Sequence, residues 1–362
     1  MSGRPLRVLH LLDVLRYSGA ETAFRVLGPM WAAHGITCDV LATGPELGEY
    51  AAPMARAGYR TGHLPLDPAA VFFRRLRPFL RREGYDVVHT HVERANAYID
   101  AVALSTGARV VQHVHQSFTF DGLLRVERTL QRAALRAAGV TFVAVSEDVA
   151  ANERRRFANR TTTIENWVDV DHYTPPSAAD RRRARAALDV PDGTVALVTV
   201  ANCHDFKNHV GLIEALTHLP LDVLWLHGGE GPLTAAEQQA AAAHGVADRI
   251  RFLGRLADPL PALHAADAYI SPSFHEGMTI SAMEALVTDL PAVLTDTPGQ
   301  SVLRRYGPPV SWADGTDAVA IAAAVRRLLE GGRPDGDAAA LRAAVDPRRA
   351  VAQLAGLYRG ET

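Results

Sequence analysis

The stretch "TVALVTVANCHDFKNHVGLIEAL", residues 194–216, contains the unit from which the whole chain is built. An apolar run (194–202) leads into a polar turn and then into a helical pattern that starts near His209. An apolar run without polar alternation predicts a strand buried on both faces, as in a parallel sheet covered by helices. A strand, a turn and a helix in this order form the repeating unit of an α/β fold.

The same pattern continues to both ends of the chain. Helix-length segments lie between the apolar runs, for example at 21–35, 123–139, 234–245 and 279–287. The predicted strands are 7–15, 38–43, 86–92, 109–116 and 140–146 in the first half, and 194–202, 221–229, 249–255, 267–273 and 290–296 in the second.

The pattern breaks once, around Pro175 and Pro176, and then restarts. We therefore predict two doubly wound parallel-sheet domains, residues 1–171 and 172–345. The last helical stretch, within 346–362, is a candidate to pack back onto the first domain. Ligands of such sheets bind beyond the carboxyl ends of the strands, so we expect a site in a cleft between the domains.

Composition argues for an ordinary soluble protein. The chain has 362 residues, 48% hydrophobic and 22% charged, and its net charge of −2 gives no reason to expect nucleic acid as a partner. Two cysteines in opposite halves, Cys38 and Cys203, favour a reducing, cytoplasmic location over a disulfide framework. The first apolar run is too short and too polar for a signal peptide or membrane span.

The segment 69–80 mixes phenylalanine and leucine with arginine, which would also suit contact with an anionic membrane. Pro78 weakens a helix here. We favour a helix that faces the core.

Lys207 is the only lysine among 38 basic residues, and it lies at a predicted strand-to-helix turn. The N–H groups of a helix N-terminus suit a phosphate, and an ammonium beside them adds a full charge. An ammonium and a guanidinium differ in shape and hydration, so the retained lysine indicates a specific role. An exposed lysine without a ligand is the alternative.

Two acids, Glu276 and Glu284, lie eight residues apart in "FHEGMTISAMEAL" (274–286). On a helix this is about 12 Å, too far for the two carboxylates of a glycosidase. It suits two separate hydroxyl-bearing parts of one long ligand, such as a sugar and a ribose. Gly277 lets the backbone approach, and the helix that begins at Thr279 could face a diphosphate between them.

Two further turns, "RYSGAET" (16–22) and "LHGGEGPL" (226–233), are candidate phosphate loops. The pairs His89/His91 and His113/His115 each lie on one face of a strand. No third ligand is evident for them, so we favour substrate contacts or packing over a metal.

Other cofactor sites have no motif in this sequence. It contains neither G-x-G-x-x-G after the first strand nor a P-loop, which argues against nicotinamide and P-loop enzymes. It also contains no nearby quartet of cysteine and histidine for zinc, so no metal is expected.

At this point the chain resembles the family 4 retaining glycosyltransferases, whose GT-B fold consists of two facing Rossmann-like domains. The resemblance runs nearly end to end. It rests on "YSGAE" (17–21), "VAVSEDV" (143–149), "IENWVDVDHY" (164–173), "HGGEGPL" (227–233), "GVADRIRFLGR" (245–255) and "ADAYISPSFHEGMTISAMEAL" (266–286).

The resemblance implies roles for individual residues. Glu276 would hold the donor-sugar hydroxyls, Glu284 the nucleotide ribose and Lys207 the donor diphosphate. His115 would contact the donor sugar near its anomeric carbon, so His115, Lys207 and Glu276 are the expected catalytic residues. The remaining expected donor contacts are Gly19, Asn202, Gly229, Glu230, Gly231, the backbone near Leu256, Gly277, Met278 and Thr279. The expected acceptor contacts are His91, Glu93 and Arg94.

The implied activity is metal-independent transfer, with retention, of a hexose or N-acetylhexosamine from a nucleotide sugar, with UDP as the favoured nucleotide. The acceptor hydroxyl could belong to a small natural product such as an aminocyclitol, to a lipid or to a polysaccharide. The family often has arginine where this chain has Asn202, and "TPGQSVL" (297–303) lacks a common glutamate. These departures motivate one alternative, a nucleotide-sugar-binding protein or partner subunit without turnover. A nucleotide-sugar epimerase of similar architecture is a second alternative.

Overall fold

The computed structural model describes residues 4–93 and 95–361, which form two compact units. The first unit combines the residues up to Trp167 with those from Pro347 onward, and the second is Val168–Asp346. The chain therefore changes unit at Trp167, a few residues before the predicted boundary at 171.

The first unit is built on a seven-stranded sheet with the order β3-β2-β1-β4-β5-β6-β7, in which every pair is parallel. The order 3-2-1-4-5-6 is that of a doubly wound dinucleotide-binding fold. Its strands are β1 Leu6–Leu12, β2 Ile36–Ala42, β3 Arg60–His63, β4 Val87–Thr90, β5 Arg109–Val114, β6 Thr141–Ala144 and β7 Thr162–Thr163.

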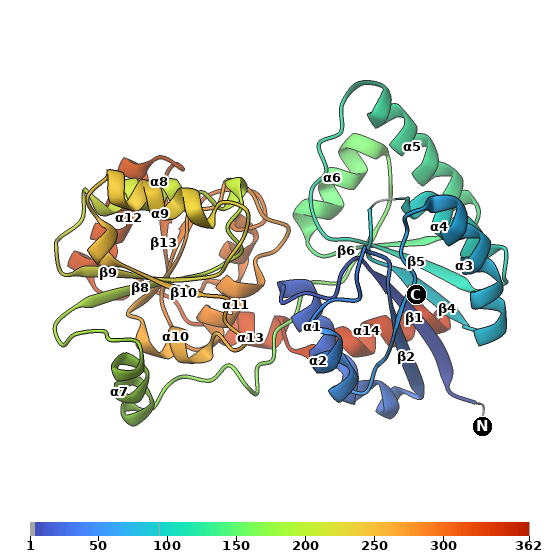
Figure 1. Cartoon of the computed structure of the whole chain (residues 1–362), viewed down its shortest axis with the longest axis horizontal. Coiled ribbons are helices and arrows are strands. Elements are labelled where there is room, and N and C mark those ends of the chain that lie inside the picture. Colours follow the sequence, from blue (N-terminus) through green and yellow to red (C-terminus); the bar gives the residue numbers. More distant parts are fainter. Residues whose placement is uncertain (1–3, 94, 362) are drawn as a thin grey trace. The chain divides into compact units, whose positions relative to one another are not determined.

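Helices cover both faces of this sheet (Figure 1). One face packs on α3 Ala69–Glu83, α4 Asn96–Leu104, α5 Gly122–Ala137 and α6 Glu147–Phe157. The other carries α1 Gly19–Leu27, the 3-10 helix η1 Gly28–His34, α2 Ala51–Arg56 and the last helix, α14 Pro347–Arg359. On this face, Tyr358 Oη lies 2.6 Å from His89 Nδ1, and Arg109 donates to the Tyr358 carbonyl at 2.6 Å.

The second unit repeats the design with six parallel strands in the order β10-β9-β8-β11-β12-β13. The strands are β8 Val195–Val200, β9 Val223–Gly228, β10 Ile250–Gly254, β11 Ala268–Ser271, β12 Ala292–Thr295 and β13 Val310–Ala313.

Two apolar cores lie on opposite faces of the second sheet. One packs against α8 His209–Leu216, α9 Thr234–Ala243 and α12 Ala318–Gly331. The other packs against α7 Ala178–Ala187, α10 Leu260–Ala265, α11 Ile280–Val287 and α13 Ala339–Ala344. Short 3-10 helices complete the unit: η2 Asp205–Lys207, η3 Ala247–Arg249 and η4 Ser301–Tyr306.

Alternation along β8 explains why its sequence is apolar throughout. Leu197 belongs to one core, whereas Ala196 and Val198 belong to the other. A strand covered on both faces needs apolar side chains at odd and even positions alike. The expectation of buried parallel strands is confirmed.

The arginine-rich segment forms α3, and its apolar side chains Phe72, Leu76 and Leu80 are buried in the first core. The helix continues through Pro78, which is exposed, as is Arg74, whose carbonyl loses its helical partner there. The preference for a core-facing helix is confirmed. In the described part of the chain, no helix combines the length and the apolar character needed to cross a bilayer.

Candidate functional site

The residues of the second unit that were expected to contact a donor gather where its sheet reverses its strand order. β8 and β11 are neighbours in the sheet, but their following helices cover opposite faces. In such sheets this reversal opens a crevice at the carboxyl ends of the strands. Lys207 follows β8 and Glu276 follows β11, so both lie at this edge.

Lys207 and Glu276 form a close ion pair. Lys207 Nζ lies 2.6 Å from Glu276 Oε1, and the two side chains are only 16% and 10% exposed. Lys207 Nζ also lies 5.2 Å from the centre of the Phe206 ring, a cation–π distance. The fold thus holds an ammonium and a carboxylate, both largely withdrawn from solvent, at one point of the sheet edge.

Glu276 is held in place by its surroundings. Ser273 Oγ donates to Glu276 Oε1 at 2.8 Å, and the Glu276 N–H donates to the Pro298 carbonyl at 3.0 Å. Gly299 has a φ of 83°, and a Cβ there would lie 2.2 Å from the Glu276 carbonyl oxygen. Only glycine fits both the conformation and the space.

The glycine turn after β9 packs against the turn that leads to Lys207. Gly229 has a φ of 147°, and a Cβ there would lie 1.8 Å from the Ala201 carbonyl oxygen. Asn202, the next residue, is exposed. The glycine turn and the turn that leads to Lys207 are therefore in direct backbone contact.

The rest of this turn faces the end of β10. Glu230 is exposed and lies 3.8 Å from Arg255, Oε2 to Nη2. Leu256 packs on the position of Gly228, where a Cβ would come within 2.6 Å of Leu256 Cδ1. Gly231 donates its N–H to Thr234 Oγ1 at 2.9 Å, at the start of α9.

The start of α11 brings the second acid into the same region. Thr279 is the N-cap residue, and Met278, Thr279 and Glu284 are buried, while Gly277 is partly exposed. The charge of Glu284, like that of Glu276, helps raise the pKa of the buried Tyr269 hydroxyl, although burial is the larger cause. Glu284 is therefore a buried helix residue and not a solvent-facing one.

In the first unit, Gly19 is exposed and is the first residue of α1. Ser18, just before it, donates its hydroxyl to the Glu21 carboxylate. Burial raises the pKa of that carboxyl. The turn after β1 therefore presents its backbone at the carboxyl end of the first sheet.

Five imidazoles meet at this edge, and we call them the five-histidine array: His10, His89, His91, His113 and His115. The two H-x-H pairs each share a face, with ring centres 4.2 Å apart for His89/His91 and 4.6 Å for His113/His115. His91 joins the array, because its Nε2 lies 3.0 Å from His10 Nδ1 and its Nδ1 lies 3.0 Å from His115 Nε2.

The array is held neutral by burial. Burial lowers the pKa of His10 to about 3 and that of His115 to about 4. It also lowers the pKa values of His89, His91 and His113 well below the usual range, and neighbouring imidazoles add to the effect. At neutral pH these rings can therefore exchange hydrogen bonds but carry no charge.

Of the expected acceptor residues, His91 belongs to the array and Arg94 lies outside the described residues. Glu93 is turned toward other side chains. It accepts from Asn96 Nδ2 at 3.0 Å, and its Oε1 lies 3.6 Å from Arg132 Nη2. Burial raises the pKa of the Glu93 carboxyl.

Two expectations about metals need correction. The H-x-H pairs do have a third potential ligand, since β1 supplies His10 to a group with His89 and His91. The second unit also assembles a quartet that the sequence spacing did not reveal, Cys203, His209, His227 and Glu237. Neighbouring strands supply the histidine group, whereas the quartet comes from the loop after β8, α8, β9 and α9, so neither group forms a local sequence motif.

The residues that support Glu276 were not predicted from the sequence. Ser273 is buried and contacts the carboxylate, and its carbonyl accepts from Thr295 Oγ1 at 2.7 Å. Gln300, also buried, donates to Thr295 Oγ1 at 3.0 Å. The only sequence signal for this support was Ser273 in "SPSFHEG" (271–277), three residues before Glu276.

Comparisons with known proteins agree over most of the chain. A sequence model of glycosyltransferase family 4 matches residues 17–172, and one of glycosyl transferases group 1 matches residues 194–331. A GDP-mannose-dependent alpha-(1-6)-phosphatidylinositol monomannoside mannosyltransferase of Mycolicibacterium smegmatis is 30% identical over 330 residues, 84% of this chain and 80% of the relative. The Bacillus subtilis glycosyltransferase EpsF is 24% identical over 312 residues, 82% of this chain and 81% of the relative.

A solved structure gives the same fold. The crystal structure of Anabaena HepE in complex with UDP superposes with a TM-score of 0.81 at 16% identity, over 98% of this chain and 100% of that one.

Proposed function

The chain belongs to glycosyltransferase family 4 and has the GT-B fold, and on this premise we propose that it transfers a sugar from a nucleotide diphosphate donor with retention and without a metal at the reacting centre. The transferred sugar is a hexose or an N-acetylhexosamine. The Lys207–Glu276 pair at the reversal point of the second sheet is the observation that carries the proposal.

The roles follow from the chemistry of the pair. Departure of the sugar leaves a negative diphosphate, and an ammonium held in a partly dry site stabilises that charge far better than one in water. Lys207 takes this part, and the N-terminus of α11 adds backbone N–H groups. Glu276 accepts from donor-sugar hydroxyls, Glu284 from the ribose, and the backbone near Leu256 holds the base.

The acceptor hydroxyl enters from the face that the diphosphate leaves, which gives retention. In the first unit, neutral His115 and His91 can exchange hydrogen bonds with bound sugar without adding a charge. A proton balance follows, because the acceptor hydroxyl loses its proton as the bond forms and the leaving phosphate oxygen can take it up.

UDP is the nucleotide we propose, supported by the UDP bound to the HepE structure, whereas the mycobacterial relative is named for GDP-mannose. For the acceptor we propose a small cyclitol-type natural product. A lipid acceptor is the alternative, as in the phosphatidylinositol mannoside of that relative's name.

Replacement of the lysine tests the proposal. Lys207→Ala should lower kcat at least about tenfold, since one charge-stabilising donor in an active site contributes about 10²–10³ in rate. Lys207→Arg retains the charge but not the shape of the side chain, so its kcat should lie between that of the unaltered protein and that of Lys207→Ala. Arg183→Ala, which removes an exposed cation on α7, is the control. Near-normal turnover of Lys207→Ala would contradict the role of Lys207 in stabilising the leaving diphosphate.

Donor class is read first by thermal shift with UDP, GDP, ADP and their sugar conjugates, each with and without EDTA. A ligand at 100 times its Kd adds about 2.7 kcal/mol of stability. The anomeric configuration of the product, followed by NMR, then tests retention. A requirement for added metal in turnover would contradict the proposed mechanism.

A protein without turnover is the second candidate, favoured by exposed Asn202 where the family often has arginine. This candidate predicts that the donor raises the melting temperature but is neither transferred nor hydrolysed. Asn202→Arg should then restore a measurable rate of sugar transfer. An epimerase would convert the donor with no acceptor present, which NMR of the donor alone detects.

A further inference from the structure

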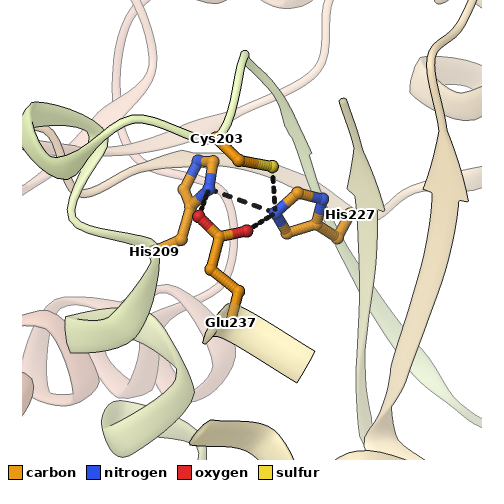
Figure 2. A group of neighbouring side chains, drawn as sticks. All are labelled: Cys203, His209, His227 and Glu237. Atoms are coloured by element: carbon orange, nitrogen blue, oxygen red, sulfur yellow. Dashed lines mark hydrogen bonds and ion pairs between the residues drawn. The ribbon is translucent and has the colours of Figure 1, made fainter. Parts of the chain in front are cut away.

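Four potential metal ligands meet in the interior of the second unit, and we call them the Cys203 cluster: Cys203, His209, His227 and Glu237. Figure 2 shows the four side chains pointing toward one centre from four different elements. They come from the loop after β8, the first turn of α8, the end of β9 and α9. Their exposed fractions lie between 0 and 2%, so the centre is closed to solvent.

The spacing of the ligand atoms suits a small tetrahedral ion. His209 Nδ1 and His227 Nε2 each lie 3.0 Å from one oxygen of Glu237, and 3.1 Å from each other. Cys203 Sγ lies 3.8 Å from His227 Nε2. Bonds of roughly 2.0–2.3 Å in a tetrahedral zinc site place ligand atoms roughly 3.3–3.8 Å apart. All four ligand atoms lie within 4.8 Å of one another, so small side-chain movements would admit the ion.

One ring nitrogen has more polar neighbours than a single proton can serve. His227 Nε2 lies 3.0 Å from Glu237 Oε2, 3.1 Å from His209 Nδ1 and 3.8 Å from Cys203 Sγ. A proton on this nitrogen can be donated to only one of them. A cation at the centre can contact all four side chains at once, because a thiolate, two imidazoles and a carboxylate all offer lone pairs to it.

We propose that the Cys203 cluster binds one Zn²⁺, or a divalent transition ion of the same kind, through Cys203 Sγ, His209 Nδ1, His227 Nε2 and the Glu237 carboxylate. Thiolate and imidazole ligands select this class of metal over Mg²⁺ or Ca²⁺. The Cys203 thiol releases its proton to solvent on binding. All four positions are filled by the protein, which makes the ion structural.

The position of the cluster gives the ion a task. The Cys203 N–H donates to the Glu230 carbonyl at 3.2 Å, and the Cys203 carbonyl accepts from the Leu233 N–H at 3.2 Å. Cys203 also lies four residues before Lys207. An ion here would tie the Lys207 turn to the glycine turn after β9 without touching a donor in the crevice.

Metal content of the full chain, purified without a metal-affinity tag, is the first measurement. We expect close to one zinc per chain by elemental analysis, lost only on prolonged chelation or unfolding because the centre is closed. Cobalt(II) exchanged into the site should give the strong visible absorption of a tetrahedral ion and a thiolate-to-metal charge-transfer band. Absence of stoichiometric metal together with absence of that band would overturn the proposal.

Variants then locate the site. Cys203→Ser should abolish the charge-transfer band, and both it and His227→Gln should weaken zinc binding at least about tenfold in chelator competition. Two controls should change neither the charge-transfer band nor zinc affinity. They are Cys38→Ser, at the cysteine of the first unit, and His218→Gln, at an exposed histidine of the second unit. A band that survives in Cys203→Ser would place the ion elsewhere and refute the assignment. If Cys203→Ser does not fold, the cobalt spectrum of the unaltered chain still decides.

Discussion

Two histidine-rich interiors, one in each unit, show how a single carboxylate changes the chemistry of buried imidazoles. In the five-histidine array, burial lowers the pKa values of the imidazoles, and the neighbouring rings lower them further. The Cys203 cluster places Glu237 between two rings. Burial alone would raise the pKa of that carboxyl, but hydrogen bonds from His209 and His227 outweigh it and lower the pKa.

The hydrogen bonding of the two interiors differs in the same way. Both ring nitrogens of His113 are buried without a hydrogen-bond partner among the described residues. The ring stacks on that of His89, with ring centres 5.2 Å apart and an angle of 3° between the ring planes. In the Cys203 cluster each imidazole directs one nitrogen at the carboxylate. The first interior therefore excludes charge, whereas the second concentrates it.

Removal of that carboxylate should have the largest effect on stability. In protein freed of metal by chelation, Glu237→Gln should lower the free energy of local unfolding around β8 and β9 by about 3 kcal/mol, because the amide is uncharged and its single oxygen can accept from only one of the two imidazoles. Hydrogen–deuterium exchange of these strands measures it. Glu214→Gln, exposed on α8, is the control. A change as small as that of the control would mean that the carboxylate does not hold the cluster.

The second-largest effect should be a loss of stability of the first unit in acid. A histidine with a folded pKa below its unfolded value of about 6.5 adds stability that is full above that pH and is lost as pH falls toward the folded pKa, here about 4 for His115. For His115 the loss of stability at pH 5.5 is about 1.4 kcal/mol. Melting temperatures at pH 7.5 and 5.5 report the loss.

One variant sharpens the acid experiment. His113→Leu removes a ring without hydrogen-bond partners, so it should flatten the pH dependence while changing stability little at pH 7.5. His218→Leu, which replaces an exposed ring, should leave the dependence as it was. Equal pH profiles for the two variants would show that the array does not set the acid response.

The smallest expected effect comes from Tyr358, whose hydroxyl contacts the array. Tyr358→Phe removes the hydroxyl that lies 2.6 Å from His89 Nδ1 and should cost about 1 kcal/mol in urea unfolding. Tyr98→Phe, at an exposed site, should cost nothing measurable. A cost that matches this control would mean that stacking alone holds His89.

The sequence predicted the interior of the fold better than its edges. All ten predicted strands exist, because a strand buried on both faces must be apolar throughout. The strands that were missed, β3, β7 and β13, lie at sheet edges. In β3 and β7 the side chains are exposed or partly exposed and polar sequences such as "RTGH" (60–63) are tolerated, so the apolar signal disappears. In β13 the residues are mostly buried, but the run of four residues is short.

The candidate site divides in the same way. Lys207 and Glu276 were predicted from local context, a lone ammonium at a βα turn and an acid beside glycine, and the structure places them 2.6 Å apart. The Cys203 cluster had no local signal. Its four members become neighbours only through the pairing of β8 with β9, in which Thr199 lies opposite His227.

The return of α14 to the first unit affects the order in which that unit can be completed during synthesis. The hydrogen bond between His89 and Tyr358 spans 269 residues, and the whole second unit lies between them. A ribosome therefore finishes the second unit while one face of the first sheet still lacks its last helix. The histidine-bearing face therefore stays without this cover until α14 has been synthesised, and we expect the nascent first unit to depend on chaperones during that interval.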